Sequence, residues 1–115
     1  MKKNVLVYVP NGLIEDDVVA TVREVHKGAE VKLVENIDAV CKTLSEHRGW
    51  AWAVLDAEPE ELERADLREA LVRNEALPVV LSQRIEDPAI SDWVFLDPPF
   101  STEMLRDALD KTRPY

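Results

Sequence analysis

The chain alternates short continuous runs of apolar, β-branched and aromatic residues with segments whose apolar residues recur at helical spacing. Continuous runs of this kind are typical of parallel strands that are buried on both faces of a sheet. Right-handed crossovers through the intervening helices return each strand to the same sheet. The alternation therefore predicts an α/β domain with helices on both faces of a parallel sheet, with strands at 4–9, 29–35, 50–55, 77–81 and 93–96.

Two helices have clear start signals, and one expected helix has almost no room. Asn36 and Ser101 can each cap the helix that follows, because their side chains accept hydrogen bonds from first-turn backbone N–H groups. The span between the fourth and fifth strands hardly fits a helix, so the fourth helix should be shortened to one turn or missing. The predicted fold is a flavodoxin-like, doubly wound five-stranded parallel sheet of order 2-1-3-4-5, and residues 1–115 are expected to form a single domain.

Two finer predictions concern the third strand and the segment that follows it. Residues 60–73 should form one amphipathic helix, with Glu60 and Arg64 paired at i,i+4 on its surface. Trp50 and Trp52 lie two positions apart on a strand, so both side chains should point to the same face of the sheet. Packing in the core or against a helix is the plain role for both indoles.

Charge and cysteine content argue against several functions. The formal net charge is −9, from 23 acidic and 14 basic residues, which opposes attraction to phosphate backbones and anionic membranes. Direct nucleic-acid binding and membrane attachment are therefore not expected. No apolar run approaches the roughly 20 residues that span a bilayer, and no signal peptide is recognisable. Cys41 is the only cysteine, so no internal disulfide can form, and we expect a cytoplasmic protein.

The residues that follow the strands are the ones to inspect for function. In a doubly wound sheet, ligands and chemistry gather at the carboxyl ends of the strands, beside the switch point between strands one and three. Asp56 ends the run WAWAVLD, and Pro59 comes three residues later. Ser82 follows the run LPVVL, and Pro99-Phe100 follows the fifth strand. These side chains should therefore lie at one edge of the sheet.

In this order, the segments resemble the receiver domains of two-component signalling over essentially the whole chain. The resemblance implies that Asp56 occupies the phosphoacceptor position and that Ser82 occupies the conserved hydroxyl position after strand four. Pro99-Phe100 matches the end of the family's Lys-Pro-Phe signature. A receiver-like signalling domain is the function that the resemblance implies.

The chain departs from the receiver pattern at the positions that make such a site reactive. Receivers carry two acidic residues after the first strand to hold a magnesium ion, and here those positions fall on Pro10 and Asn11. The family's lysine, which neutralises the phosphoryl group, falls on Pro98. Mg²⁺ binds mainly through carboxylates, and phosphoryl transfer depends on electrostatic stabilisation. We therefore expect a vestigial site at Pro10, Asn11, Ser82 and Pro98, with at best weak Mg²⁺ binding by Asp56 and Asn11 and no other cofactor.

Other chemically capable residues have plainer explanations. The acidic residues 15–17 fall in a first helical turn, where carboxylates compensate the helix dipole. His26 and His47 lie near helix ends, where imidazoles more often satisfy carbonyls or face solvent than bind metal or transfer phosphate. Cys41 lies on the apolar face of a helix and is expected to be inert. Asp56 itself can serve as an ordinary turn carboxylate.

Three functions remain open, and an independent enzyme is not among them, because no phosphate loop, catalytic triad or metal-spaced Cys/His cluster is recognisable. The first is a degenerate receiver that acts through protein–protein contacts, with a histidine kinase or an output domain as partner. The second is an atypical receiver still phosphorylated on Asp56 by a histidine kinase. The third is a small flavodoxin-like binding domain or cofactor carrier unrelated to signalling. Homodimer formation is compatible with each.

Overall fold

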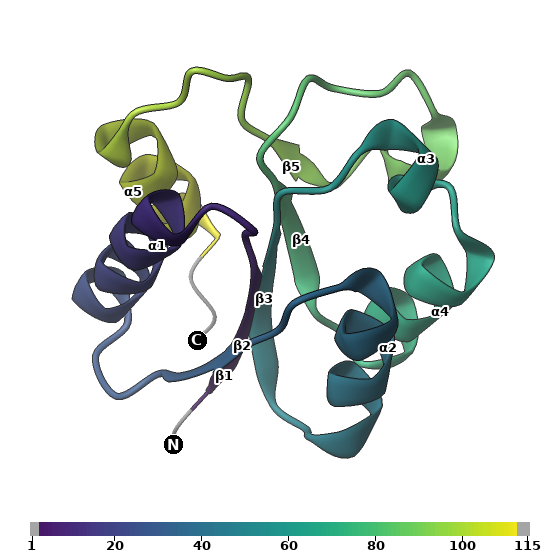
Figure 1. Ribbon diagram of the computed structural model, residues 1–115, viewed down its shortest axis with the longest axis horizontal. Helices are drawn as coiled ribbons and strands as arrows, with labels where there is room; N and C mark the ends of the chain where they lie inside the picture. The colour runs from purple at the N-terminus through teal and green to yellow at the C-terminus, as the bar shows by residue number, and fades with distance from the viewer. Residues whose placement is uncertain (1–2, 113–115) are drawn as a thin grey trace.

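The computed structural model describes residues 3–112 and contains a five-stranded sheet (Figure 1). The strands are β1 (Asn4–Tyr8), β2 (Glu30–Leu33), β3 (Trp50–Leu55), β4 (Leu77–Val80) and β5 (Val94–Phe95). Every pair of neighbouring strands is parallel, and the order across the sheet is β2-β1-β3-β4-β5. The predicted strand order is therefore confirmed.

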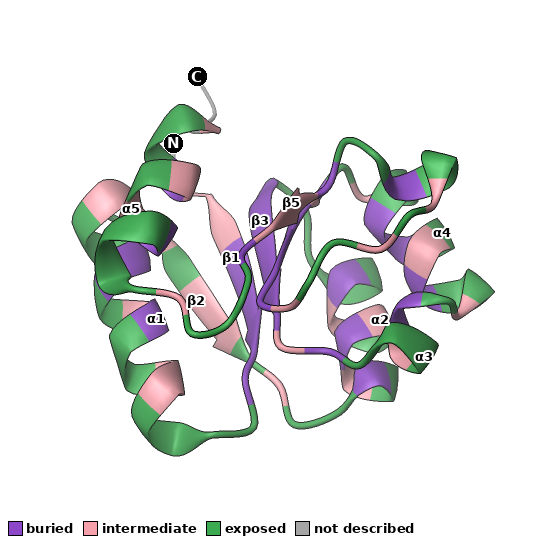
Figure 2. Cartoon of the chain, turned by 90° about the horizontal axis from the view of Figure 1, so that it is seen from above, coloured by how far each residue is buried: buried purple, intermediate pink, exposed green. Residues whose placement is uncertain are grey.

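Helices cover both faces of the sheet. They are α1 (Gly12–Val25), α2 (Ile37–Glu46), α3 (Pro59–Leu62), α4 (Ala65–Arg73) and α5 (Thr102–Lys111). Helices α1 and α5 lie on one face, and α2, α3 and α4 lie on the other (Figure 1). The central strands are buried between the two helical layers, whereas the outer surfaces of the helices are exposed (Figure 2). This is the doubly wound arrangement that the alternating pattern predicts.

The connection between β4 and β5 contains no α-helix. A single 3-10 turn, η1 (Pro88–Ile90), stands where a doubly wound domain normally has its fourth crossover helix. Ile90 and Trp93 are 1% and 6% exposed, and both pack into the core on the α2 and α4 side of the sheet. These two side chains close the space that a longer helix would otherwise cover. The predicted shortening of the fourth helix is confirmed.

The segment 60–73 forms two helices, which corrects the prediction of one. Arg64 lies between α3 and α4 with an extended backbone, at φ −63° and ψ 125°. Its guanidinium pairs with Asp38 of α2 and with Asp66, each at 2.7 Å, and the predicted pair with Glu60 is not formed. The contact with Asp38 is a tertiary contact between helices, and helical spacing along one segment does not reveal such a contact.

Trp50 and Trp52 point to opposite faces of the sheet, which contradicts the prediction. Asn4 lies opposite Trp50 and Val5 lies opposite Trp52, so Ala51 is an extra residue in β3. A bulge of this kind breaks the strict alternation of side chains along a strand. Trp50 therefore packs on the α2 and α4 side, whereas Trp52 packs on the α1 and α5 side.

Nearby side chains form hydrogen bonds with the free backbone groups at the helix ends. The Asn36 side chain accepts a hydrogen bond from the Ala39 N–H at 2.7 Å, and the Ser101 hydroxyl accepts one from the Met104 N–H at 3.1 Å. Both predicted N-caps are thus confirmed. At the other end of α2, the Trp50 indole N–H lies 3.1 Å from the Leu44 carbonyl oxygen.

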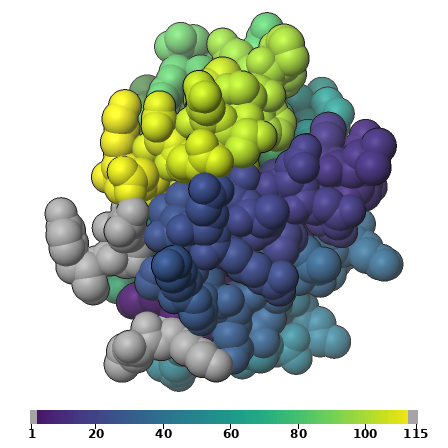
Figure 3. All heavy atoms as spheres, turned by 90° about the vertical axis from the view of Figure 1, so that its left-hand side faces the viewer, coloured from purple at the N-terminus to yellow at the C-terminus, as the bar shows by residue number. Residues whose placement is uncertain are grey.

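Helices α1 and α5 lie side by side on the face shown in Figure 3, where α5 is yellow and α1 is purple to blue. An ion pair at 3.0 Å between Arg106 of α5 and Glu24 of α1 joins their outer surfaces. Within residues 3–112, every helix is too short or too polar to cross a membrane.

The turn after α1 depends on the conformational freedom of Gly28. This residue has a φ of +86°, and a Cβ added to it would meet no atom within 4 Å, so backbone strain alone opposes a larger residue. We expect Gly28→Ala to lower the free energy of unfolding by about 1–2 kcal/mol, as measured by urea denaturation. Gly12→Ala is the matched control, because Gly12 also has open space around it but begins α1 without a positive φ. Equal losses in the two variants would contradict this explanation.

Candidate functional site

Asp56 follows β3 at the carboxyl edge of the sheet, between the ends of β1 and β4. The Asp56 N–H donates to the Tyr8 carbonyl oxygen at 2.8 Å, and the Leu81 N–H donates to the Leu55 carbonyl oxygen at 2.8 Å. These bonds continue the parallel ladder past the strand ends. Asp56 is half-buried as a result, and its carboxylate lies among the residues that follow the neighbouring strands.

A hollow of about 410 Å³ opens beside Asp56. It brings together four of the residues singled out in the sequence, because Asp56, Pro59, Ser82 and Pro98 all line it. The full lining consists of Asp56, Ala57, Glu58, Pro59, Leu81, Ser82, Gln83 and Pro98. This set includes two carboxylates and no basic residue. An incoming phosphoryl group would therefore meet negative charge without a lining cation to offset it.

The surroundings of Asp56 raise the pKa of its carboxyl group. Burial is the larger cause, and repulsion from the Glu61 carboxylate is the second. The Glu58 N–H donates to Glu61 Oε1 at 2.9 Å. Burial and the nearby Glu61 carboxylate raise the pKa of the Tyr8 hydroxyl, which places Glu61 beside the end of β1 as well. Glu61 is thereby held near Asp56. Both effects shift the protonation equilibrium of Asp56 toward the neutral carboxyl group.

Replacing Asp56 with asparagine should stabilise the domain at neutral pH. When the pKa of a carboxyl group is higher in the folded state than in the unfolded state, the free energy of unfolding of the domain falls as the pH rises. The fall begins near the unfolded pKa, about 3.9, and is complete above the folded pKa. Asp56→Asn removes that loss, because burial raises the pKa of Asp56. The variant should therefore be more stable than the wild type at pH 7, and the difference should disappear below about pH 4.

Urea denaturation at the two pH values measures this difference. Asp97→Asn is the control, because Asp97 is an exposed carboxylate at the same edge of the sheet. An Asp56→Asn variant that is less stable than the wild type at pH 7 would show that the Asp56 carboxylate is held by favourable contacts instead.

Pro10 and Asn11 follow β1 and do not line the hollow. Pro10 is exposed and has no side-chain oxygen. The Asn11 side-chain oxygen accepts hydrogen bonds from the N–H groups of Leu13 at 3.0 Å and Ile14 at 3.3 Å, and so caps α1. A magnesium ion is bound mainly by carboxylates, so one carboxylate and an amide oxygen already engaged in a cap fit it poorly.

No group of three or more His, Cys, Asp or Glu side chains is placed to hold a metal ion within residues 3–112. The weak Mg²⁺ site expected at Asp56 and Asn11 stays a prediction. The acidic side chain of Glu15 lies in the first turn of α1, as expected for a residue that compensates the helix dipole.

Pro98, the residue that the resemblance places at the lysine position of receivers, lines the hollow, and no Lys or Arg is among the lining residues. Pro98 is exposed, and its peptide bond to the next proline is cis. The Ser82 hydroxyl donates to the Gln83 carbonyl oxygen at 3.3 Å. Arg84, two residues further on, is turned toward β5, where its guanidinium lies 5.0 Å from the centre of the Phe95 ring. Arg84 therefore lies outside the lining of the hollow and stacks on β5.

The histidines and the cysteine lie away from the residues that line the hollow. His26 and His47 are the C-cap residues of α1 and α2, near the helix ends as expected. Each packs edge to face against a tryptophan, His26 on Trp52 at 6.1 Å and His47 on Trp50 at 6.3 Å between ring centres. Cys41 is half-buried against the core, and burial raises the pKa of its thiol, which favours the unreactive protonated form.

Sequence reasoning missed Tyr8 and Glu61 as residues that shape the site. In the sequence, Tyr8 belongs to the apolar run of the first strand, and Glu61 is one of several acids after Pro59. One signal was present: Glu61 comes three residues after Glu58, the spacing at which a side chain reaches back to a helix start.

Several solved structures have the same fold at low sequence identity. A response regulator receiver domain from Bacillus halodurans is 16% identical, with 100% of each chain covered and a TM-score of 0.79. The chemotaxis protein CheY4 of Vibrio cholerae is 17% identical, with 97% of this chain and 99% of that chain covered and a TM-score of 0.71. An orphan response regulator of H. pylori is 12% identical, with 97% of each chain covered and a TM-score of 0.71. No protein-family model and no curated protein matches the sequence.

The similarity extends over nearly the whole described domain. It includes the five-stranded parallel sheet of order 2-1-3-4-5 and the helices that cover it. The chain therefore has the fold of the response-regulator receiver domains.

Proposed function

We propose that this domain is a degenerate receiver that acts through protein–protein contacts rather than through efficient phosphoryl transfer. The receiver fold supports the signalling class. The observation that carries the second part is the hollow beside Asp56, whose lining contains two carboxylates and no basic residue. Phosphoryl transfer depends almost entirely on positioning and on electrostatic stabilisation of the phosphoryl oxygens. A hollow with two carboxylates and without a lining cation offers little electrostatic stabilisation.

A histidine kinase or an output domain is the kind of partner that such a domain would contact in the cytoplasm. The net charge of −9 argues against direct contact with nucleic acid or an anionic membrane. The surface between β5 and α5 is a natural place for contact, because the large apolar side chain of Met104 is exposed there. Val94, Leu96 and Met104 line a hollow there, between β5 and α5. A homodimer through this surface is the alternative arrangement.

A second candidate function is an atypical receiver that a histidine kinase still phosphorylates on Asp56. One observation favours it, because Asp56 and Ser82 line the same hollow, as a phosphoacceptor and its hydroxyl partner would. Any magnesium ion would then be held by Asp56 together with Asn11, backbone or water oxygens. The engagement of the Asn11 oxygen in the α1 cap argues against tight binding.

Incubation with acetyl phosphate and Mg²⁺, followed by intact-mass measurement, tests the choice between the two candidates. We expect no gain of a phosphoryl group beyond the level seen in Asp56→Asn, which cannot be phosphorylated at this position. Ser82→Ala serves as a second control for modification at the neighbouring hydroxyl. Stoichiometric phosphorylation that is lost only in Asp56→Asn would reject the degenerate receiver in favour of the atypical one.

A further inference from the structure

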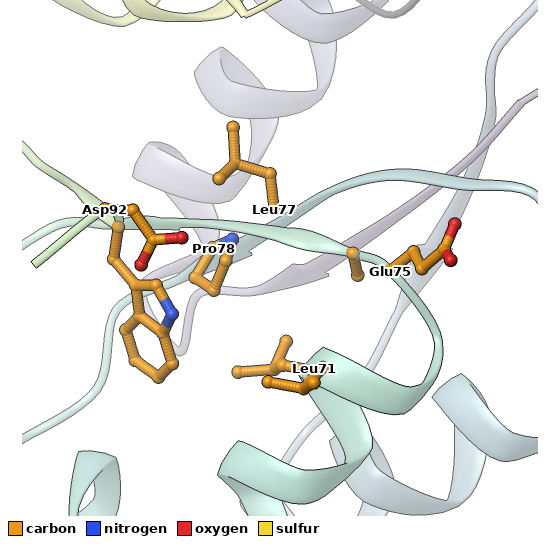
Figure 4. A pocket seen from close by; sticks show the side chains of 8 residues that line it. Leu71, Glu75, Leu77, Pro78 and Asp92 are labelled. Atoms are coloured by element: carbon orange, nitrogen blue, oxygen red, sulfur yellow. The ribbon is translucent and has the colours of Figure 1, made fainter. Parts of the chain in front are cut away.

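A second hollow lies at the amino edge of the sheet, the opposite end from Asp56 (Figure 4). It has a volume of about 300 Å³ and lies where β4 begins and the chain approaches β5. We call it the amino-edge groove and define it by the apolar residues Leu71, Val72, Leu77, Pro78 and Trp93. The carboxylates of Glu75 and Asp92 border it, and Figure 4 shows them on opposite sides, with Leu77 and Pro78 between.

The groove exposes apolar surface that a partner would cover. Val72 is 74% exposed, although Leu67, Ala70 and Leu71 of the same helix α4 are buried. Trp93 is mostly buried and forms one wall with the remainder of its surface. Covering such surface is favourable in proportion to the apolar area removed from water. Val72 and the half-buried Leu77 supply most of this apolar surface, because Leu71, Pro78 and Trp93 are buried.

The edge of β4 at the groove is unsuited to the addition of a strand. β5 pairs with β4 only from Val79 onward, so the start of β4 has no neighbour on that side. The Val80 carbonyl accepts from the Leu96 N–H across this edge, and Pro78, two residues earlier, faces the same way. Pro78 has no N–H to donate, and proline at an exposed edge blocks strand pairing. An occupant of the groove must therefore be recognised through its side chains.

The charges at the border of the groove select a basic occupant. Among the described residues, neither Glu75 nor Asp92 has an ion-pair partner. Glu75 also has a φ of +54°, the left-handed conformation that favours glycine or asparagine. Asparagine is present one position earlier, at Asn74, yet glutamate occupies the strained position. This conformation closes the end of α4, because the Glu75 N–H donates to the Val72 carbonyl oxygen and the Ala76 N–H donates to the Leu71 carbonyl oxygen. It leaves the Glu75 carboxylate at the border of the groove.

We propose that the amino-edge groove docks a segment of a partner protein that presents apolar side chains flanked by basic residues. The proposal rests on the proposed function, because it names one surface through which this domain contacts a partner. It does not depend on phosphate at Asp56, which lies at the other end of the sheet. A second copy of this chain fits poorly as the occupant, because two chains of net charge −9 repel each other.

A peptide titration followed by amide NMR of the intact protein tests the proposal. The probe is acetyl-Lys-Ala-Leu-Phe-Ala-Arg-amide, and the control peptide has glutamate in place of both basic residues. The test variant is Glu75→Gln with Asp92→Asn. The control variant is Glu35→Gln with Glu103→Gln, which changes the net charge by the same amount at exposed positions outside the groove.

We expect saturable shifts at the amides of the groove residues with the basic peptide alone, weakened roughly fivefold in the test variant and unchanged in the control variant. Three results would overturn the proposal: no amide shifts at millimolar peptide, an equal loss of peptide affinity in both variants, or self-association of the protein through the groove. If the peptide causes no amide shifts and acetyl phosphate does not modify Asp56, the docking proposal is rejected and the degenerate-receiver proposal is retained. Phosphorylated Asp56 with intact groove binding rejects only the degenerate receiver.

Discussion

The Trp52→Ala variant should lose about 3–5 kcal/mol of its free energy of unfolding, a large share of the roughly 5–15 kcal/mol that stabilises a typical domain. Trp52 is 0% exposed and packs in the core between the sheet and helices α1 and α5. Its indole N–H donates to Thr112 Oγ1 at 2.9 Å, which joins β3 to the residue that caps the end of α5. Alanine removes the packing and this bond together and leaves a cavity. Urea denaturation at pH 7 measures the loss.

Leu13→Ala is the matched control for loss of apolar side-chain atoms, because Leu13 is 81% exposed. Its stability should stay within about 0.5 kcal/mol of the wild type. Amide NMR also tests on which face of the sheet each indole packs. Trp52→Ala should shift the amide signals of α1 and α5, whereas Trp50→Ala should shift those of α2. A Trp52→Ala variant of wild-type stability, or one that perturbs α2 instead, would contradict the bulge at Ala51.

Restoring the receiver-type residues should convert Asp56 into a site that binds Mg²⁺ and a phosphoryl analogue. The variant combines Pro10→Asp, Asn11→Asp and Pro98→Lys. Asp at position 11 keeps an N-cap for α1, and the added carboxylates and cation supply what the hollow beside Asp56 lacks. We expect Mg²⁺-dependent binding of beryllofluoride to strengthen on the order of tenfold or more, which corresponds to about 1.4 kcal/mol. Isothermal titration calorimetry measures the change.

The same triple variant with Asp56→Asn is the control, and it should bind no better than the wild type. Thermal denaturation shows whether each variant is folded before binding is compared. A folded triple variant that still fails to bind would contradict the proposal that the residues at these three positions limit binding at Asp56. The position of Glu61 beside Asp56 would then become the first alternative cause, because it disfavours the ionised carboxylate.

The strand order and the grouping of Asp56, Ser82 and Pro98 were predictable from the sequence. Each apolar run is a local signal, and the alternation with helices leaves few ways to assemble a parallel sheet. Once the sheet is known, residues that follow neighbouring strands must meet at one edge. The shortened connection before Trp93 was also predictable, because too few residues lie between the fourth and fifth strands for a full helix with its loops.

The features that sequence reasoning missed depend on contacts between distant segments. The bulge at Ala51 is defined by the register of β3 against β1, so the alternation rule misplaced Trp52. The break at Arg64 is accompanied by the ion pair with Asp38 on another helix. The effect of Glu61 on Asp56 depends on how α3 folds back toward the end of β1. None of these contacts leaves a periodic pattern along the chain.

Amide NMR of the wild-type protein with Mg²⁺ and beryllofluoride tests the central claim most directly, because it reads the response of Asp56 and its neighbours without a kinase. Asp56→Asn, titrated in parallel, separates binding at this carboxylate from effects elsewhere. We expect no saturable shifts around Asp56, Ser82 and Ala57 in the wild type beyond those seen in the variant. Clear saturable shifts at these amides that are absent from Asp56→Asn would contradict the account and identify a working receiver.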